Sequence, residues 1–350
     1  ARGGRIPVPS DTVLAALADG TWKAPRAGGT FPRLNGTDAE WKAITAKDDG
    51  WLEDATLRGG YAFASIDAPY GFGSLRVPIE LKRGANEFLF SVGRGRLRAA
   101  LAAPPSSSFF DLADLTLPDF VAGETRTVLA GVVIVNASRA PLTNARVLAR
   151  CGSSASQSIV PTIPALSVRK VAVALVPPAN PTGESVAVKL ELLTTEGRNR
   201  TTLHTADTAV RVRSARQVHR RTFQSQIDGS VQYYAVNPAQ YTSSGNALAL
   251  TLHGASVEGQ GQAEAYRSKD WITLVAPTNR RPYGFDWEDW GRWDAMEVLA
   301  EAKRTVPHDP RRVHVTGHSM GGHGTWHLGL TFPDRFGTVA PSAGWSSFFS

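Results

Sequence analysis

Cysteine is nearly absent from this chain, which has one among 350 residues. A single cysteine excludes an intramolecular disulfide and any metal site built from a cysteine cluster. Cys151 alternates with Val147 and Ala149, and this spacing is typical of a strand with one face in a core. We therefore predict that Cys151 is a buried strand residue.

Long apolar runs are also missing. No window approaches the roughly 18 consecutive apolar residues that a membrane helix needs. The sequence therefore predicts no membrane span. Because the chain begins at Ala1 without an initiator methionine, a secretory signal would lie outside the printed residues. We expect a periplasmic or secreted protein.

The net charge of +7 is not concentrated in one basic stripe. Such a stripe is the usual signature of a nucleic-acid binder. The densest basic stretch, from Arg211 to Arg221, has no interleaved aromatic residue. We interpret it as a solvated linker, with nucleic-acid binding as the weaker alternative, and predict no nucleic-acid partner.

The first half of the chain reads as β structure in two parts. Phe88, Phe90 and Val92 alternate with Leu89 and Ser91, and turn signals are frequent, which is typical of a sandwich or jelly roll. A proline- and serine-rich run at 104–108 marks a boundary. We predict an irregular or partial segment at 1–50, a β-rich galactose-binding-like partial jelly roll at 51–108 and an immunoglobulin-like β-sandwich at 109–214.

Beyond Ser214 the pattern changes, because strands begin to alternate with helices. A hairpin signal at Asp228-Gly229 comes first. Alternation of this kind builds a parallel sheet with crossover helices. We expect strands at residues 247–252, 271–276, 313–316 and 338–341, and helices at 294–304 and 320–330.

Ser319 lies in the sequence Gly317-His318-Ser319-Met320-Gly321, between an apolar strand and a helical stretch. A serine in such a sharp strand-to-helix turn has a strained backbone, and glycine is needed two residues before and after it. The turn exposes the hydroxyl beyond the carboxyl end of the strand, where open α/β sheets bind ligands. We predict that Ser319 is a catalytic nucleophile.

A second part of the same chemistry is predicted at Leu252-His253-Gly254-Ala255, which ends a strand. Acyl transfer places negative charge on an oxygen, and each preorganised backbone N–H can stabilise it by about 3 kcal/mol. The predicted donors of this oxyanion hole are Met320 and Ala255, with Gly254 as the close alternative. An ordinary strand-to-loop turn remains open as another interpretation.

The stretch from Gly317 to Gly344 resembles the nucleophile region of bacterial α/β hydrolases. The similar branches are the prolyl-oligopeptidase-like and the feruloyl-esterase or polyhydroxybutyrate-depolymerase-like enzymes. Residues 309–313 and Asp294 also match, and the similarity covers roughly residues 216–350. The resemblance implies a multidomain fold class, with two N-terminal all-β sandwiches followed by a truncated α/β-hydrolase doubly wound sheet at 215–350.

The resemblance also implies a triad in the order Ser, Asp, His, with the last two after the seventh and eighth strands. Both are expected beyond Ser350, so the C-terminal part of the hydrolase domain would be missing. Only His323, His327 and Asp334 follow Ser319 as candidates, in or just after the helix behind it. Without a base a serine is a poor nucleophile, so we expect the printed chain to be inactive or nearly so.

Several weaker signals have structural interpretations. His323 and His327 have a zinc-compatible spacing but lack a third ligand, so no metal is predicted. The tryptophans at 287, 290 and 293 are more easily explained as core than as a binding wall. His318 is expected to pack or to line the pocket, and Gly259-Gln260-Gly261 to be a flexible active-site loop.

The predicted function is a serine hydrolase that cleaves an ester or peptide bond through an acyl-enzyme on Ser319. A prolyl-oligopeptidase-like peptidase is favoured over a carboxylesterase, no cofactor is expected, and the substrate could be linked to a polysaccharide. The alternative is a non-catalytic carbohydrate- or cell-surface-binding protein with a degenerate hydrolase domain.

Overall fold

The computed structural model describes residues 101–346 with short gaps at 180, 182, 197–198, 281–283 and 285. It also describes residues 76–81 and 83, and the backbone of four short strands nearer the N-terminus. The chain forms two compact units, one of residues 1–63 and 80–103, the other of residues 64–79 and 104–350. Most of the segments predicted at 1–50 and 51–108 lie outside the described residues.

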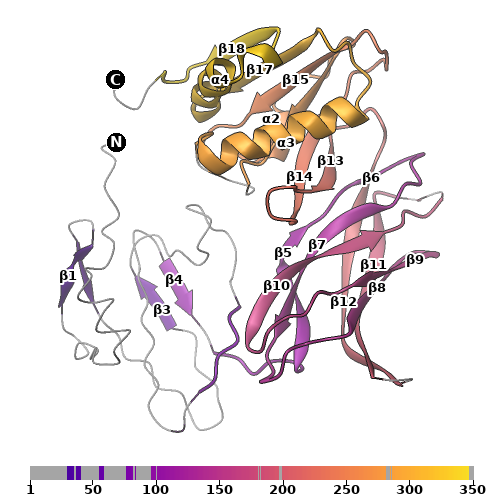
Figure 1. Ribbon diagram of the computed structural model, residues 1–350, viewed down its shortest axis with the longest axis vertical. Helices are drawn as coiled ribbons and strands as arrows, with labels where there is room; N and C mark the ends of the chain where they lie inside the picture. The colour runs from indigo at the N-terminus through magenta and orange to yellow at the C-terminus, as the bar shows by residue number, and fades with distance from the viewer. Residues whose placement is uncertain are drawn as a thin grey trace. The chain divides into compact units, whose positions relative to one another are not determined.

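The described part of the first unit consists of two antiparallel strand pairs (Figure 1). These are β1 (Thr30–Leu34) with β2 (Thr37–Glu40), and β3 (Ala55–Arg58) with β4 (Arg96–Ala99). The alternating segment around Phe88 lies outside the described residues, so the jelly roll stays a prediction.

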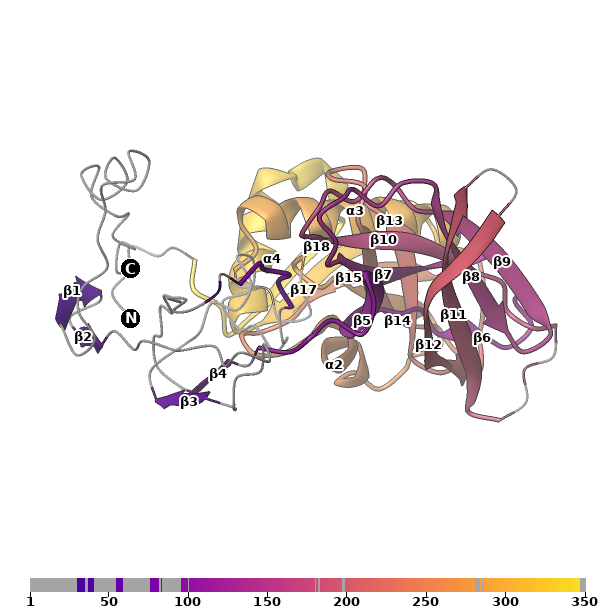
Figure 2. The same ribbon diagram turned by 90° about the horizontal axis from the view of Figure 1, so that it is seen from below.

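Residues 105–213 of the second unit, the β region, form two sheets. Their strand orders are β10-β7-β5 and β6-β12-β11-β8-β9, and Figure 2 separates the two sets of strands. The strands are β5 (Ser108–Thr116), β6 (Phe120–Val121), β7 (Val128–Asn136), β8 (Ala145–Cys151), β9 (Ser154–Ile159), β10 (Ser167–Leu175), β11 (Ser185–Glu196) and β12 (Asn199–Arg213).

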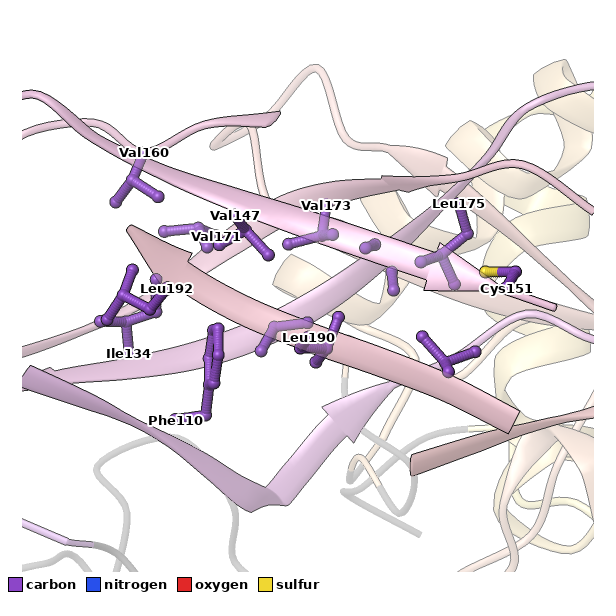
Figure 3. Packing of buried hydrophobic residues seen from close by; sticks show 14 of the residues in the cluster. Phe110, Ile134, Val147, Cys151, Val160, Val171, Val173, Leu175, Leu190 and Leu192 are labelled. Atoms are coloured by element: carbon purple, nitrogen blue, oxygen red, sulfur yellow. The ribbon is translucent and has the colours of Figure 1, made fainter. Parts of the chain in front are cut away.

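One hydrophobic core lies between these two sheets (Figure 3). It exists because alternate residues of each strand point the same way, as when Val147 and Cys151 are buried while Arg146 is exposed. Strand β7 is buried on both faces, since Ile134 joins the main core and Val133 a second cluster. The prediction of a buried Cys151 is confirmed, and burial raises the pKa of its thiol to about 11.

Residues 214–346, the α/β region, contain a six-stranded sheet of order β13-β14-β16-β15-β17-β18. The first three strands pair antiparallel and the remaining neighbours pair parallel. The strands are β13 (His219–Gln224), β14 (Val231–Asn237), β15 (Ala247–Leu252), β16 (Ile272–Ala276), β17 (Val313–His318) and β18 (Thr338–Ser342). The helices are α2 (Gly259–Glu264), α3 (Asp289–Thr305), α4 (Met320–Thr331) and the short 3₁₀ helix η1 (Pro333–Arg335).

The helices cover both faces of this sheet. Leu299 of α3 and Leu328 of α4 share one cluster with Leu250, whereas Ala263 of α2 packs with Ala235 and Ala276 in another. Because β16 and β17 flank β15 on opposite sides, the carboxyl ends of β15 and β17 become neighbours. Among the helices of the described residues, none is both long and apolar enough to cross a membrane.

Two predictions about loops are wrong. Gly259 begins helix α2 instead of lying in a flexible loop. The basic stretch is not a solvated linker. Arg211 lies in β12 and makes a bidentate pair with Asp119, and Arg221 lies in β13 and pairs with Glu124. Spacing alone did not reveal these partners, which lie about a hundred residues away in sequence and meet the arginines only after folding.

Candidate active site

Ser319 occupies the sharp turn between β17 and α4. Its φ of 57° and ψ of −120° are sparsely populated for a residue with a side chain. A side chain at Gly317 would overlap the carbonyl of Gly321 and lie 2.8 Å from that of Leu252, and one at Gly321 would overlap the Leu252 carbonyl. Glycine is therefore sterically required at both predicted positions.

The backbone around Ser319 is held on both sides. Its N–H donates to the carbonyl of Ser342 at the end of β18 (2.9 Å), and its carbonyl accepts from the N–H groups of Gly322 (2.8 Å) and His323 (3.1 Å). The side chain is half-buried. Ser319 also occupies the N-cap position of α4 without a side-chain capping bond, and the helix dipole favours negative charge there.

The loop at residues 253–257, which we call the oxyanion loop after its predicted role, lies beside this turn. Strands β15 and β17 pair with Leu252 opposite Gly317, so the chain after Leu252 emerges beside Ser319. A Cβ placed on Gly254 would stand 3.6 Å from the Cβ of Ser319. Within residues 101–346, outside the short gaps, the N–H groups of Ala255 and Met320 donate to no protein acceptor. Both groups can therefore donate to a ligand.

The side chain of His253 connects the oxyanion loop to Thr278 through hydrogen bonds. Its ring is fully buried, with Nδ1 2.9 Å from the carbonyl of Gly254 and Nε2 3.2 Å from that of Thr278. Burial lowers the pKa of His253, so the ring is neutral and donates from one nitrogen at a time. The indole of Trp287 stands edge-on to it and donates to the His253 carbonyl (3.1 Å).

The three spaced tryptophans have different environments. Trp287 is fully buried, and its ring fills the space that a side chain at Gly324 of α4 would need. Trp290 and Trp293 are 57% and 49% exposed. Core packing, our favoured interpretation, therefore holds for Trp287 alone.

The other histidines near the turn have partners away from Ser319. His323 is buried, with Nε2 3.0 Å from the Glu288 carboxylate and Nδ1 3.0 Å from the Trp345 carbonyl. His318 is exposed, and its Nδ1 lies 3.3 Å from the hydroxyl of Ser342. In the part of the chain that the structure describes, no group of three His, Cys, Asp or Glu side chains could hold a metal ion.

Met320 connects the turn to the loop after β16. Its side chain is fully buried, and its sulfur accepts a hydrogen bond from the N–H of Asp286 (3.1 Å). Burial raises the pKa of Asp286. Neither this contact nor that of Trp287 with His253 could be predicted from local patterns, because each joins segments more than 30 residues apart.

Backbone strain is concentrated around this site. Among the described residues, nine other than glycine have positive φ, and seven of them follow the carboxyl ends of β15, β16, β17 or β18. These seven are Ser256, Asn279, Arg280, Asp286, Asp289, Ser319 and Ala343. Such conformations cluster at functional sites because surrounding structure must hold them.

The region that carries this geometry also matches a known family. Residues 239–348 match the esterase family model, described as "Putative esterase", which covers less than a third of the 350 residues. The match includes β15 to β18, the oxyanion loop and Ser319. No curated protein matches the chain.

Several solved structures similar to this chain are described as hydrolases or esterases. They include an S-formylglutathione hydrolase from Staphylococcus aureus (18% identity, TM-score 0.29) and a ferulic acid esterase from Anaeromyces mucronatus (12%, 0.29). These similarities cover 37% and 35% of this chain, which spans 57% of each of those chains. A thermostable esterase shares 15% identity over 68% of this chain and 77% of its own, with a TM-score of 0.32. At these TM-scores the similarities carry no functional argument.

Proposed function

We propose that the protein is a serine hydrolase that cleaves carboxylic esters through an acyl-enzyme on Ser319. The observation that carries this proposal is the strained turn of Ser319 with the oxyanion loop packed against it. The esterase family match over residues 239–348 supports the same reaction class.

In the proposed reaction, Ser319 Oγ attacks the ester carbonyl carbon as its proton passes to a base. The tetrahedral intermediate carries an oxyanion, to which the N–H groups of Met320 and Ala255 donate. Two such donors can together lower the barrier by about 6 kcal/mol. The intermediate expels the alcohol, which takes up the proton, and water then hydrolyses the acyl-enzyme to the free acid.

The base is proposed to be a histidine, held by an aspartate, outside the 350 printed residues, as the resemblance implies. Among the described residues, no histidine is hydrogen-bonded to the hydroxyl of Ser319. His253 and His323 are buried with other partners, and neither is free to turn towards Ser319.

Ester cleavage is proposed in preference to peptide cleavage, because the matching family is an esterase family and no observation favours a peptidase. A polysaccharide-linked ester is one candidate substrate. A purely binding protein would have no use for a strained serine, which costs about 1–3 kcal/mol to hold. We therefore rank the non-catalytic alternative below the enzyme.

The test is fluorophosphonate labelling of the full-length protein, together with hydrolysis of 4-nitrophenyl butyrate and of a matched 4-nitroanilide. We expect labelling and ester hydrolysis in the wild type and a loss of about ten-thousand-fold or more in Ser319→Ala. Ser244→Ala, an exposed serine before β15, is the matched control and should retain both. Labelling that persists in Ser319→Ala would refute the assignment, and faster cleavage of the anilide would favour a peptidase.

A further inference from the structure

Glu258 connects the oxyanion loop to helix α2. It lies three residues after Ala255 and immediately before the first residue of α2. Its carboxylate accepts hydrogen bonds from Nη2 of Arg220 (3.1 Å) and from the hydroxyl of Tyr233 (3.2 Å). The Arg220 guanidinium also stands 4.7 Å over the Tyr233 ring. We call Arg220, Tyr233 and Glu258 the loop clamp.

The β region holds the backbone of Arg220. Asp119, just before β6, accepts a hydrogen bond from the Arg220 N–H (2.8 Å) and donates its own N–H to the Arg220 carbonyl (3.0 Å). The Asp119 side chain is buried and is fixed by two further bonds from Arg211 (2.9 and 3.0 Å). The position of Arg220 therefore depends on the β region as well as on β13.

The segment between Ser319 and the loop clamp has little freedom. At one end a Cβ on Gly254 would stand 3.3 Å from the carbonyl oxygen of His318 and 3.6 Å from the Cβ of Ser319. At the other end a Cβ on Gly259 would stand 2.9 Å from the carbonyl oxygens of Ala276 and Pro277. A turn bond from the Val257 N–H to the Gly254 carbonyl (3.3 Å) closes the loop between them. A shift of Glu258 would therefore move the N–H of Ala255.

We propose that the β region is part of the catalytic apparatus, because through Asp119 and the loop clamp it positions the oxyanion loop. Arg220 is a positioning residue in this arrangement, since it does not touch the reacting atoms. The inference rests on the proposed function, which assigns an oxyanion-hole role to the Ala255 N–H.

A merely stabilising role for Arg220 predicts a different outcome. The side chains of Arg220 and Glu258 are 26% and 28% exposed, and ion pairs in contact with solvent contribute little to stability. A displaced oxyanion donor, in contrast, lowers kcat without weakening substrate binding, because the oxyanion exists only in the transition state. The two roles therefore separate in the ratio of the kcat and KM effects.

The experiment compares Arg220→Met with Arg221→Met in the full-length protein. Arg221 is the matched control, because it is the next residue of β13 and pairs with Glu124 of the β region but does not reach α2. For Arg220→Met we expect kcat for 4-nitrophenyl butyrate to fall about 10- to 100-fold with KM within about twofold. Hydrogen exchange of the amides at 254–258 should become about tenfold faster.

Arg221→Met should leave kcat and this exchange within about twofold of the wild type. Arg220→Lys, which keeps the charge, should recover part of the lost kcat. Unchanged kcat and exchange in Arg220→Met, or equal losses in Arg221→Met, would overturn the inference. If the wild type hydrolyses no ester, the proposed function fails, but faster exchange confined to Arg220→Met would still support the positioning of the loop.

Discussion

The β region and the α/β region differ in how many residues other than glycine adopt a positive φ. In the β region, alternating strands bury apolar side chains in one main core, and two described non-glycine residues, Asn144 and Leu166, have positive φ. In the α/β region there are seven, all beyond the carboxyl ends of parallel strands. The strained backbone conformations thus gather at the edge of the sheet where Ser319 lies.

Buried ionisable groups occur in both regions. The α/β region buries His219, His253, Asp294 and His323, whereas the β region buries one free thiol and two carboxylates, at positions 111 and 119. A buried ionisable group lowers stability unless it is paired. The comparison teaches that the two regions differ in where residues other than glycine adopt positive φ, and much less in how many ionisable groups they bury.

The largest expected difference in stability is between alanine substitutions at two glycines, one in each region. Gly321→Ala should destabilise the α/β region by about 4 kcal/mol or more, because the new Cβ would overlap the carbonyl of Leu252. Gly123→Ala in the β region meets no atom within 4 Å and has only its φ of 86° to strain, which costs about 1–2 kcal/mol. Denaturant unfolding measures both, and equal losses would contradict the comparison.

Core truncation should affect the two regions separately. Leu190→Ala in β11 and Leu250→Ala in β15 each remove a fully buried side chain, and each should cost about 2–5 kcal/mol. The β region has no tryptophan, so tryptophan fluorescence reports on other parts of the chain. We expect Leu190→Ala to shift the unfolding midpoint seen by circular dichroism more than that seen by fluorescence. Equal shifts would show that the two regions unfold as one unit.

Asp294 should make the protein less stable as pH rises. Burial raises its pKa to about 6, more than the nearby Arg280 charge lowers it. The folded state therefore binds the proton more tightly, and stability falls as pH rises from about 4 through about 6. Asp294→Asn removes this loss, so the variant should gain about 3 kcal/mol relative to the wild type over that window. Thermal unfolding at pH 4 and 7 tests it, and a constant difference would contradict it.

His219 should have the opposite effect and make the protein less stable as pH falls. Burial lowers its pKa to about 4, so its contribution to stability is present above about pH 6.5 and is lost as pH falls through about 4. His219→Gln should therefore gain about 3 kcal/mol relative to the wild type on acidification. The same unfolding series measures it, with Asp294→Asn as the contrasting variant.

The smallest expected changes in stability come from substitutions of exposed apolar side chains. Leu330 in α4 is 75% exposed and Ile159 in β9 is 72% exposed. Leu330→Gln and Ile159→Thr should each change the free energy of unfolding by less than about 0.5 kcal/mol. A larger loss in either variant would show that its side chain is covered by another surface in solution.

Much of the local structure could be predicted from local patterns. Strand β15 begins and ends where its apolar run does, and the glycines around Ser319 indicated the turn that the structure contains. Helix α3 begins at Asp289, five residues before the predicted start, because tryptophans and acidic residues obscured its first turn. Helix α2 was missed because its first turn carries glycines, which are poor helix formers. A glycine is needed at 259 because the helix begins so close to the end of β16 that a side chain there would not fit.

By itself, the sequence determined which segments alternate, where the strained serine stands and which residues must be small, because these depend on neighbours within a few positions. Only the tertiary structure decided which distant groups meet. Arg220 could not be assigned a partner from its own surroundings, because Asp119 and Glu258 reach it from about 100 residues before and 40 residues after it. Contacts of that range depend on strand order and sheet pairing, which local patterns do not specify.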